Sequence, residues 1–180
     1  GYEINVSCPN VKAGGVAIGA VPEQVEATTR LVREVTERPV IVKLTPNVTD
    51  ITEIARAAQG GGADAVSCIN TVIGMVIDVE AQRPVLPAGT GGLSGPAILP
   101  IGVAAVYKVA RSVSIPVIGI GGIMSTEDAV QYLLAGASAV QVGTANFVDP
   151  RIAPRISVGL TRYAERHGLA TLADFHAALR

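Results

Sequence analysis

The sequence contains few cysteines, few aromatic residues and no excess of charge of either sign. Only Cys8 and Cys68 occur among its 180 residues, too few for a disulfide framework, so we expect a reducing compartment and a cytoplasmic protein. Aromatic residues make up 3% of the chain, which offers no platform for stacking nucleic-acid bases. The formal net charge is -1, and lysines and arginines form no basic run. No nucleic-acid partner is therefore expected.

No apolar segment is both long enough and continuous enough to predict a membrane span. Two uncharged stretches, residues 84–107 and 129–148, are interrupted, the first by four prolines and the second by a glycine between two alanines. We therefore expect no membrane association. The two histidines, His167 and His176, show no metal-ligand spacing, so we predict that both lie at the surface and that the chain has no metal site.

What the sequence does contain is a regular alternation of apolar runs and helix-forming stretches. Hydrophobic residues make up 49% and charged residues 16%, a composition typical of one folded globular domain. Runs rich in Val and Ile predict strands at residues 2–7, 40–44, 65–69, 116–120 and 139–142, apolar on both faces. Helices are predicted at residues 22–36, 49–60, 97–112, 126–135 and 154–166. Thr49 and either Ser125 or Thr126 are the predicted N-caps, and Gly60 and Gly136 the predicted helix ends.

Strands alternating with helices indicate an α/β fold with a parallel sheet, either an open doubly wound sheet or most of an eight-stranded barrel. Polar and glycine residues gather at the C-terminal ends of the predicted strands, which meet at one mouth in a barrel. The sequence therefore favours a TIM (β/α)8 barrel, shortened to about its last five βα units, with the N-terminal units absent. The chain opens on Gly1 without an initiator Met, as a fragment or processed chain would. We expect residues 1–180 to form a single barrel domain.

Two glycine-rich turns and one lysine suggest an anionic ligand. Residues 118–123 are Ile-Gly-Ile-Gly-Gly-Ile, and residues 141–145 are Gln-Val-Gly-Thr-Ala. Glycines let backbone amides approach a phosphate closely, and the turns after the last two barrel strands are the usual phosphate site of this fold, although tight βα turns would look the same. Lys43 lies in an otherwise apolar strand, where an unpaired ammonium is costly to bury. An anionic ligand explains that position, and an ammonium that reaches solvent at the strand end is the alternative.

Cys8 is a candidate functional residue. It follows an apolar strand and stands among polar residues that include Asn10, which favours a functional role over that of an inert core thiol. Cys68 lies within a predicted strand and is expected to be a core residue. Asn70 and Thr71, at the mouth end of that strand, either bind a planar polar ligand or cap their turn.

Together these motifs resemble the class 1 dihydroorotate dehydrogenases, and the 1B subclass in particular. The resemblance covers nearly the whole chain and includes Glu-Ile-Asn-Val-Ser-Cys-Pro-Asn at residues 3–10, which is similar to the family's active-site loop. The other matching motifs are Val-Lys-Leu-Thr-Pro-Asn at 42–47, Ile-Asn-Thr, Gly-Met and Ile-Asp within 69–78, Gly-Gly-Leu-Ser-Gly-Pro at 91–96, and residues 119–123 and 142–147.

The resemblance assigns roles to individual residues. It implies that Cys8 is the catalytic base and that Asn5 contacts both flavin and substrate. The residues implied to hold FMN are Asn5, Lys43, Ile69, Gly95, Gly121, Gly122, Gly143 and Thr144, and those implied to bind orotate are Asn5, Asn10, Asn70 and Thr71.

The resemblance also implies an activity and partners. The expected reaction is oxidation of dihydroorotate to orotate in pyrimidine biosynthesis, with Cys8 removing a proton and FMN accepting a hydride. Electrons would pass to NAD through a partner subunit that carries FAD and an iron-sulfur cluster, and a homodimer is expected. Two alternatives stay open: a flavoenzyme like dihydropyrimidine dehydrogenase, and a non-catalytic barrel fragment that binds phosphate or flavin.

Overall fold

A computed structural model describes residues 1–7 and 18–179 of the chain, and a five-stranded parallel sheet forms its centre. The strands, in order across the sheet, are β1 (Tyr2–Asn5), β2 (Val40–Leu44), β3 (Ala65–Cys68), β8 (Val117–Ile120) and β9 (Ala139–Gln141). All five predicted strands are confirmed, and the observed bounds differ from the predicted ones by at most two residues. Short runs rich in Val and Ile therefore locate the five strands of this parallel sheet.

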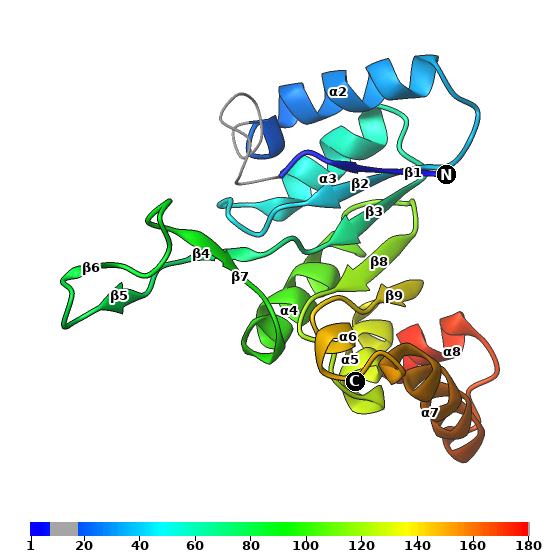
Figure 1. Cartoon of the computed structure of the whole chain (residues 1–180). Helices are drawn as coiled ribbons and strands as arrows, with labels where there is room; N and C mark the ends of the chain where they lie inside the picture. The colour runs from blue at the N-terminus through cyan, green and yellow to red at the C-terminus, as the bar shows by residue number, and fades with distance from the viewer. Residues whose placement is uncertain (8–17, 180) are drawn as a thin grey trace.

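The order of the strands decides between the two predicted architectures. Strands follow one another across the sheet as they do along the chain, so each crossover advances in the same direction. Right-handed crossovers then place every helix on the same face, whereas a doubly wound sheet reverses its order once. The helices that follow the strands are α2 (Pro22–Glu34), α3 (Ile51–Gly60), α4 (Leu99–Val109) and α5 (Thr126–Ala135), and each packs against the next along the sheet (Figure 1). The arrangement is that of consecutive units of a TIM barrel.

The helices cover one of the two faces of the sheet. In β2, Val40, Val42 and Leu44 have no exposed surface, whereas the alternating Ile41 and Lys43 are half-buried. Successive side chains of a strand point to opposite faces, so the buried set packs under the helices. We call the opposite face, which would line the interior of a closed barrel, the inner face. It carries Glu3, Asn5, Ile41, Lys43, Ser67, Ile118, Ile120 and Gln141. The prediction that the strands are apolar on both faces is therefore wrong for the inner face.

Local capping explains where two of the helices begin. The predicted cap Thr49 is wrong, because Asp50 precedes α3 and its carboxylate accepts hydrogen bonds from the Thr52 backbone N–H (2.8 Å) and hydroxyl (2.7 Å). The predicted cap Ser125 is confirmed, since its hydroxyl oxygen accepts the backbone N–H of Asp128 at 3.2 Å. Gly136 ends α5 in the left-handed region at φ 116°, as predicted for a glycine in this place.

The C-terminal part adds helices beside α5. The last predicted helix is confirmed as α7 (Ile152–His167), and both α6 (Ala145–Val148) and α8 (Leu172–Ala178) were missed. Helix α8 begins with a capping box in which Thr171 and Asp174 bond reciprocally to each other's backbone N–H groups. His167 and His176 are both exposed, as predicted. No helix among residues 18–179 is long and apolar enough to cross a membrane.

An antiparallel excursion between β3 and α4 projects from the sheet, at the left of Figure 1. It consists of β4 (Val72–Gly74) paired with β7 (Gly91–Leu93) and β5 (Ile77–Asp78) paired with β6 (Arg83–Pro84), and the short helix η1 (Pro96–Ile98) follows it. We call residues 72–93 the arm. Many of its large apolar side chains are exposed, among them Met75, Val76 and Val79. The sequence did not predict the arm, because its strands are two or three residues long and are interrupted by glycines and prolines.

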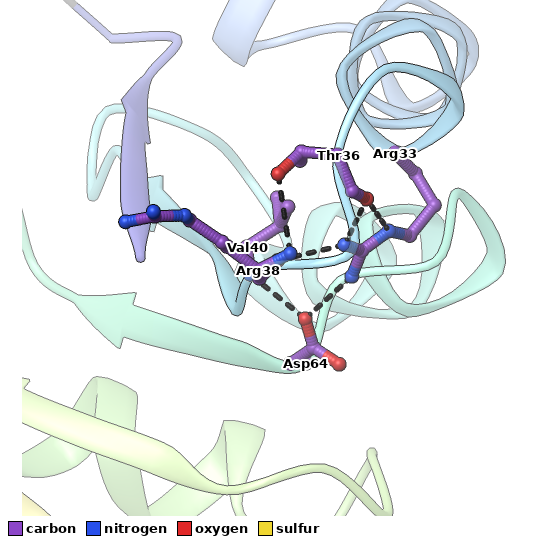
Figure 2. A network of polar contacts seen from close by, with 5 residues as sticks. All are labelled: Arg33, Thr36, Arg38, Val40 and Asp64. Carbon is purple, nitrogen blue, oxygen red and sulfur yellow. Dashed lines mark hydrogen bonds and ion pairs between the residues drawn. The ribbon is translucent and has the colours of Figure 1, made fainter.

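A polar network closes the end of the sheet opposite the C-terminal strand ends (Figure 2). The guanidinium of Arg33, near the end of α2, donates to the backbone oxygens of Thr36 and Arg38 and pairs with Asp64 at 2.7 Å. The same Asp64 oxygen accepts the backbone N–H of Val40 at 2.7 Å. Because Val40 starts β2 and Asp64 precedes β3, this network joins α2 to the beginning of two strands and leaves their C-terminal ends free for ligands.

Candidate active site

A cavity of about 220 Å³ opens at the C-terminal ends of β2, β3, β8 and β9. Most of the residues predicted as ligands line it, although they come from five separate parts of the chain. These are Lys43, Ile69, Asn70, Thr71, Gly95, Gly121, Gly122, Gly143 and Thr144. The cavity also contains residues that the sequence did not single out as ligands, namely Ser94, Ile98, Ile120, Ile123, Met124 and Ala145.

Lys43 supplies the cationic side chain of this cavity. It is the penultimate residue of β2, points to the inner face and is half-buried. No ion pair involves Lys43 within the described part of the chain, so its ammonium is available to an anionic ligand. The geometry places the charge where a bound ligand would meet it, at the mouth rather than under the helices.

Gly122 shows why the turn after β8 requires glycine. Its φ of 71° lies in the left-handed region, which side chains disfavour. A Cβ built on Gly122 would stand 2.6 Å from the backbone nitrogen of Leu99 and 2.9 Å from the carbonyl oxygen of Gly95. The backbone of the β8–α5 turn therefore touches the backbone at the start of α4. By contrast, a Cβ on Gly143 would meet nothing within 4 Å, because Gly143 faces the open cavity.

Tyr132 supports the same turn from below and was missed by the sequence analysis. Its phenol is fully buried, and the hydroxyl donates to the carbonyl oxygen of Gly121 at 2.7 Å. Burial raises the pKa of the Tyr132 phenol, so the group remains a hydrogen-bond donor. A tyrosine on the same helix face as the apolar residues Ala129 and Leu133 of α5 was the available signal. Cys68 lies nearby in the core, where burial raises the pKa of its thiol, and its prediction as a core residue is confirmed.

Asparagine side chains connect the ends of β1, β2 and β3. The Asn70 amide donates to the side-chain oxygen of Asn5 and to the carbonyl oxygen of Ser7, both at 3.2 Å. The Ser7 hydroxyl donates to the carbonyl oxygen of Lys43 at 3.0 Å. The segment that precedes Cys8 is thus tied to the two neighbouring strands. Cys8 and Asn10 themselves lie outside the described residues.

Two further polar contacts shape the rim of the cavity. The Thr144 hydroxyl donates to the Ser94 hydroxyl oxygen at 2.9 Å and joins the turn after β9 to the segment before η1. The Asn47 amide donates to the carbonyl oxygen of Thr71 at 3.0 Å and accepts the backbone N–H of Ile73 at 2.9 Å. Asn47 thereby holds the base of the arm, a role the sequence did not reveal.

The chemistry of these side chains fits FMN. Ile69, Ile98, Ile120 and Ile123 offer apolar surface to a flat ring, while Asn70 and Thr71 offer donors and acceptors to polar edges. Glycine turns expose backbone amides to a phosphate, and Lys43 adds a positive charge. Ligand pockets usually enclose roughly 300–1,000 Å³, so the described residues form part of such a pocket. No group of three His, Cys, Asp or Glu side chains among the described residues could hold a metal ion.

Comparison with known proteins identifies relatives of this chain. The family profile described as dihydroorotate dehydrogenase matches residues 2–163. The catalytic subunit of dihydroorotate dehydrogenase B (NAD(+)) from Phocaeicola vulgatus is 54% identical over 177 residues, and that from Alkaliphilus metalliredigens is 52% identical over the same length. These matches cover 98% of this chain but 58% and 59% of the relatives, so the chain spans a little over half of their length.

Solved structures give the same assignment. DHODH from Eimeria tenella in complex with ferulenol is 26% identical to this chain with a TM-score of 0.77, and the match covers 96% of this chain and 52% of that one. The ligand-free form of the same enzyme superimposes with a TM-score of 0.78. The match of the family profile to most of the sequence, together with this likeness in fold, shows that the chain belongs to the dihydroorotate dehydrogenase family.

Proposed function

We propose that the full-length protein containing this chain oxidises dihydroorotate to orotate, with FMN held in the cavity at the strand ends. The observation that carries the proposal is the convergence of Lys43, Asn70, Thr71 and the glycine turns on one cavity, in a chain whose relatives are named dihydroorotate dehydrogenase B catalytic subunits. Residues 1–180 would belong to a single FMN-binding barrel domain. Pyrimidine biosynthesis is the process this reaction serves.

Each predicted residue has a place in the proposal. FMN would be held by Asn5, Lys43, Ile69, Gly95, Gly121, Gly122, Gly143 and Thr144, and orotate by Asn5, Asn10, Asn70 and Thr71. The hydrogen bond between Asn70 and Asn5 supports a shared role, because it places two amides side by side at the mouth. Amides suit a pyrimidine, since each offers a donor and an acceptor to the imide edge of the ring.

The reaction removes a proton and a hydride from adjacent carbons of dihydroorotate and leaves a carbon–carbon double bond. Cys8 would take the proton from the carbon next to the ring carbonyl, as a thiolate that becomes a thiol. FMN, when bound, supplies the acceptor for the hydride. Asn5 and Asn70 would hold the substrate so that both carbons face their acceptors.

The proposal extends to partners and location. The relatives' designation as catalytic subunits and the NAD(+) in their names favour a second subunit that passes electrons to NAD. We propose FAD and an iron-sulfur cluster as the carriers on that subunit, a homodimer of the catalytic chain, and a cytoplasmic location. The exposed apolar side chains of the arm support contact with another protein copy, because such surface favours association.

The two alternatives predict different outcomes. A dihydropyrimidine dehydrogenase-like enzyme would turn over uracil rather than orotate, and the names of the relatives favour the orotate enzyme. A non-catalytic barrel fragment would leave the full-length protein, after reconstitution with FMN, either without flavin or with a flavin that dihydroorotate does not bleach. Stoichiometric FMN together with bleaching by dihydroorotate separates the proposed enzyme from both.

Cys8→Ala in the full-length protein tests the mechanism. We expect the variant to fold, retain FMN and bind orotate, while dihydroorotate bleaches its flavin about 10²–10⁴-fold more slowly in stopped flow, because the base is lost. Cys8→Ser should recover little near neutral pH, since a hydroxyl is a much weaker acid than a thiol. Cys68→Ala is the matched control, because it removes a buried thiol from the core and should lower stability without slowing bleaching. Bleaching of Cys8→Ala at the parent rate would remove Cys8 from the mechanism.

A further inference from the structure

Two residues of the five parallel strands carry a formal charge, and both lie on the inner face. They are Glu3 in β1 and Lys43 in the neighbouring strand β2. Lys43 lines the cavity, whereas Glu3 does not. The Glu3 carboxylate instead accepts a hydrogen bond from the Ser67 hydroxyl (2.5 Å) on one oxygen and from the Gln141 amide (3.2 Å) on the other. One donor on each oxygen holds this carboxylate in place on the inner face, where the Glu3 side chain is exposed in the described part of the chain.

Glu3, Ser67 and Gln141 form one layer of a barrel interior. They come from the first, third and fifth strands of the sheet. In the register of the sheet, Glu3 of β1 pairs with Ile41 of β2, which pairs with Ala65 of β3. Ser67 is two residues beyond Ala65 along β3. Ser67 is level with Ile118 and hence with Ala139, and Gln141 is again two residues further on.

A constant advance of one residue per strand is the stagger of a TIM barrel, in which alternate strands contribute the side chains of each layer. With the same advance of two residues for every second strand, Lys43 of β2 shares a layer with Ile120 of β8. Asn5 of β1 shares another layer with Ile69 and Gly143, which follow β3 and β9. These two sets are the next layers toward the mouth, and all of them except Asn5 line the cavity. The Glu3 carboxylate therefore lies directly beneath the cavity floor. The Cα of Glu3 is about 6.6 Å below that of Asn5, because two strand residues rise by this amount.

We propose that Glu3 tunes the flavin, holding its two-electron reduction potential below the value that Lys43 alone would produce. The inference rests on the proposed function. A hydride brings two electrons and one proton, so the bound ring gains one negative charge. Lys43 favours this charge and the Glu3 carboxylate opposes it, and the opposition promotes transfer of the two electrons onward to the next carrier.

Ser67 and Gln141 are what make Glu3 effective. With both oxygens already bonded, the carboxylate stays one layer below, and Lys43 remains free for the ligand. A unit charge on the order of 10 Å from the flavin ring, at an effective dielectric constant of about 20 and partly screened by solvent because Glu3 is exposed, would change the equilibrium constant for reduction by about three- to tenfold.

The experiment is a measurement of the two-electron potential of the full-length, FMN-loaded protein. Glu3→Gln preserves shape and removes the charge, so we expect the potential to rise by roughly 15–30 mV, which is the three- to tenfold change expressed for two electrons. Glu3→Met, also uncharged, should show the same rise. Glu3→Gln combined with Gln141→Glu returns one carboxylate to the layer and should restore the parent potential. Glu53→Gln, an exposed residue on α3, is the matched control and should leave the potential unchanged.

The outcomes separate this inference from the proposed function. A full-length protein that binds no FMN refutes both. If the protein binds FMN and dihydroorotate bleaches it, the proposed function stands. If its reduction potential is then unchanged or lowered in Glu3→Gln and Glu3→Met, the role of Glu3 is refuted. A rise in both uncharged variants that the exchanged pair does not reverse would also refute it, because the effect would then come from packing rather than charge.

Discussion

Replacing Gly122 with alanine should destabilise the protein, because two independent penalties fall on the same residue. An alanine at φ 71° costs about 1–2 kcal/mol for its left-handed backbone. Its Cβ would also stand 2.6 Å from the Leu99 nitrogen and 2.8 Å from the Leu99 Cα, and backbone atoms cannot move aside as a flexible side chain can. Overpacking of this kind costs about 1–3 kcal/mol. We therefore expect a loss of about 2–5 kcal/mol, a large fraction of the stability of a typical domain.

Urea unfolding of the apoprotein measures this loss without a contribution from bound cofactor. Gly143→Ala is the matched control, because it lies in the same cavity, its φ is not in the left-handed region and its new Cβ would meet nothing within 4 Å. We expect Gly143→Ala to change the free energy of unfolding by less than about 1 kcal/mol. If Gly122→Ala and Gly143→Ala unfolded at the same urea concentration, the contact between the β8–α5 turn and the start of α4 would not have the geometry described.

Three further predictions concern single side chains. Lys43→Ala should weaken FMN binding about ten- to a hundredfold in fluorescence titration, because a charged hydrogen bond is lost. Lys43→Arg should not restore the affinity. An unchanged affinity in Lys43→Ala would show that the Lys43 ammonium reaches solvent and does not contact FMN. Tyr132→Phe should lower the free energy of unfolding by about 1–2 kcal/mol, since the buried carbonyl of Gly121 loses its donor, and an unchanged urea midpoint would contradict that bond. The pKa values of Asp50, Asp149 and Asp174 are lowered by hydrogen bonds from Thr52, the Arg151 backbone and the Thr171 backbone, respectively. The stability that these carboxylates add to the fold should therefore be complete above about pH 4 and lost as the pH falls further. An Asp174→Asn variant should lose less stability on acidification than the parent, as measured by thermal unfolding.

The strands and most helices could be predicted because their signals are local. Val40–Leu44 forms β2 as predicted, since a β-branched run packs well on a pleated, half-buried surface. The start of α3 was misplaced by one residue, because Thr49 and Asp50 are both good caps and only the backbone geometry chooses between them. The arm was not predicted, since its two ladders are two or three residues long and the longer ladder pairs residues about 20 positions apart.

The site could be predicted in part, for the same reason. Lys43 was found because a charge in an apolar strand stands out in the sequence, and the glycine turns were found because they follow two consecutive strands at the usual phosphate site of this fold. The same argument applied to Glu3, but its partners Ser67 and Gln141 are 64 and 138 residues away, so nothing local marked it as part of a layer.

The sequence by itself determined the five strands of the parallel sheet and the main helices, which residues end those strands and what chemistry those residues offer. Only the tertiary structure decided that the strands run in chain order without reversal, and hence that the sheet belongs to a barrel rather than to a doubly wound fold. It also decided which residues of different strands are level with one another. Strand periodicity states only which side chains share a face, whereas register depends on hydrogen bonds between segments far apart in the chain. The layer that places a carboxylate beneath the candidate flavin site is a consequence of that register.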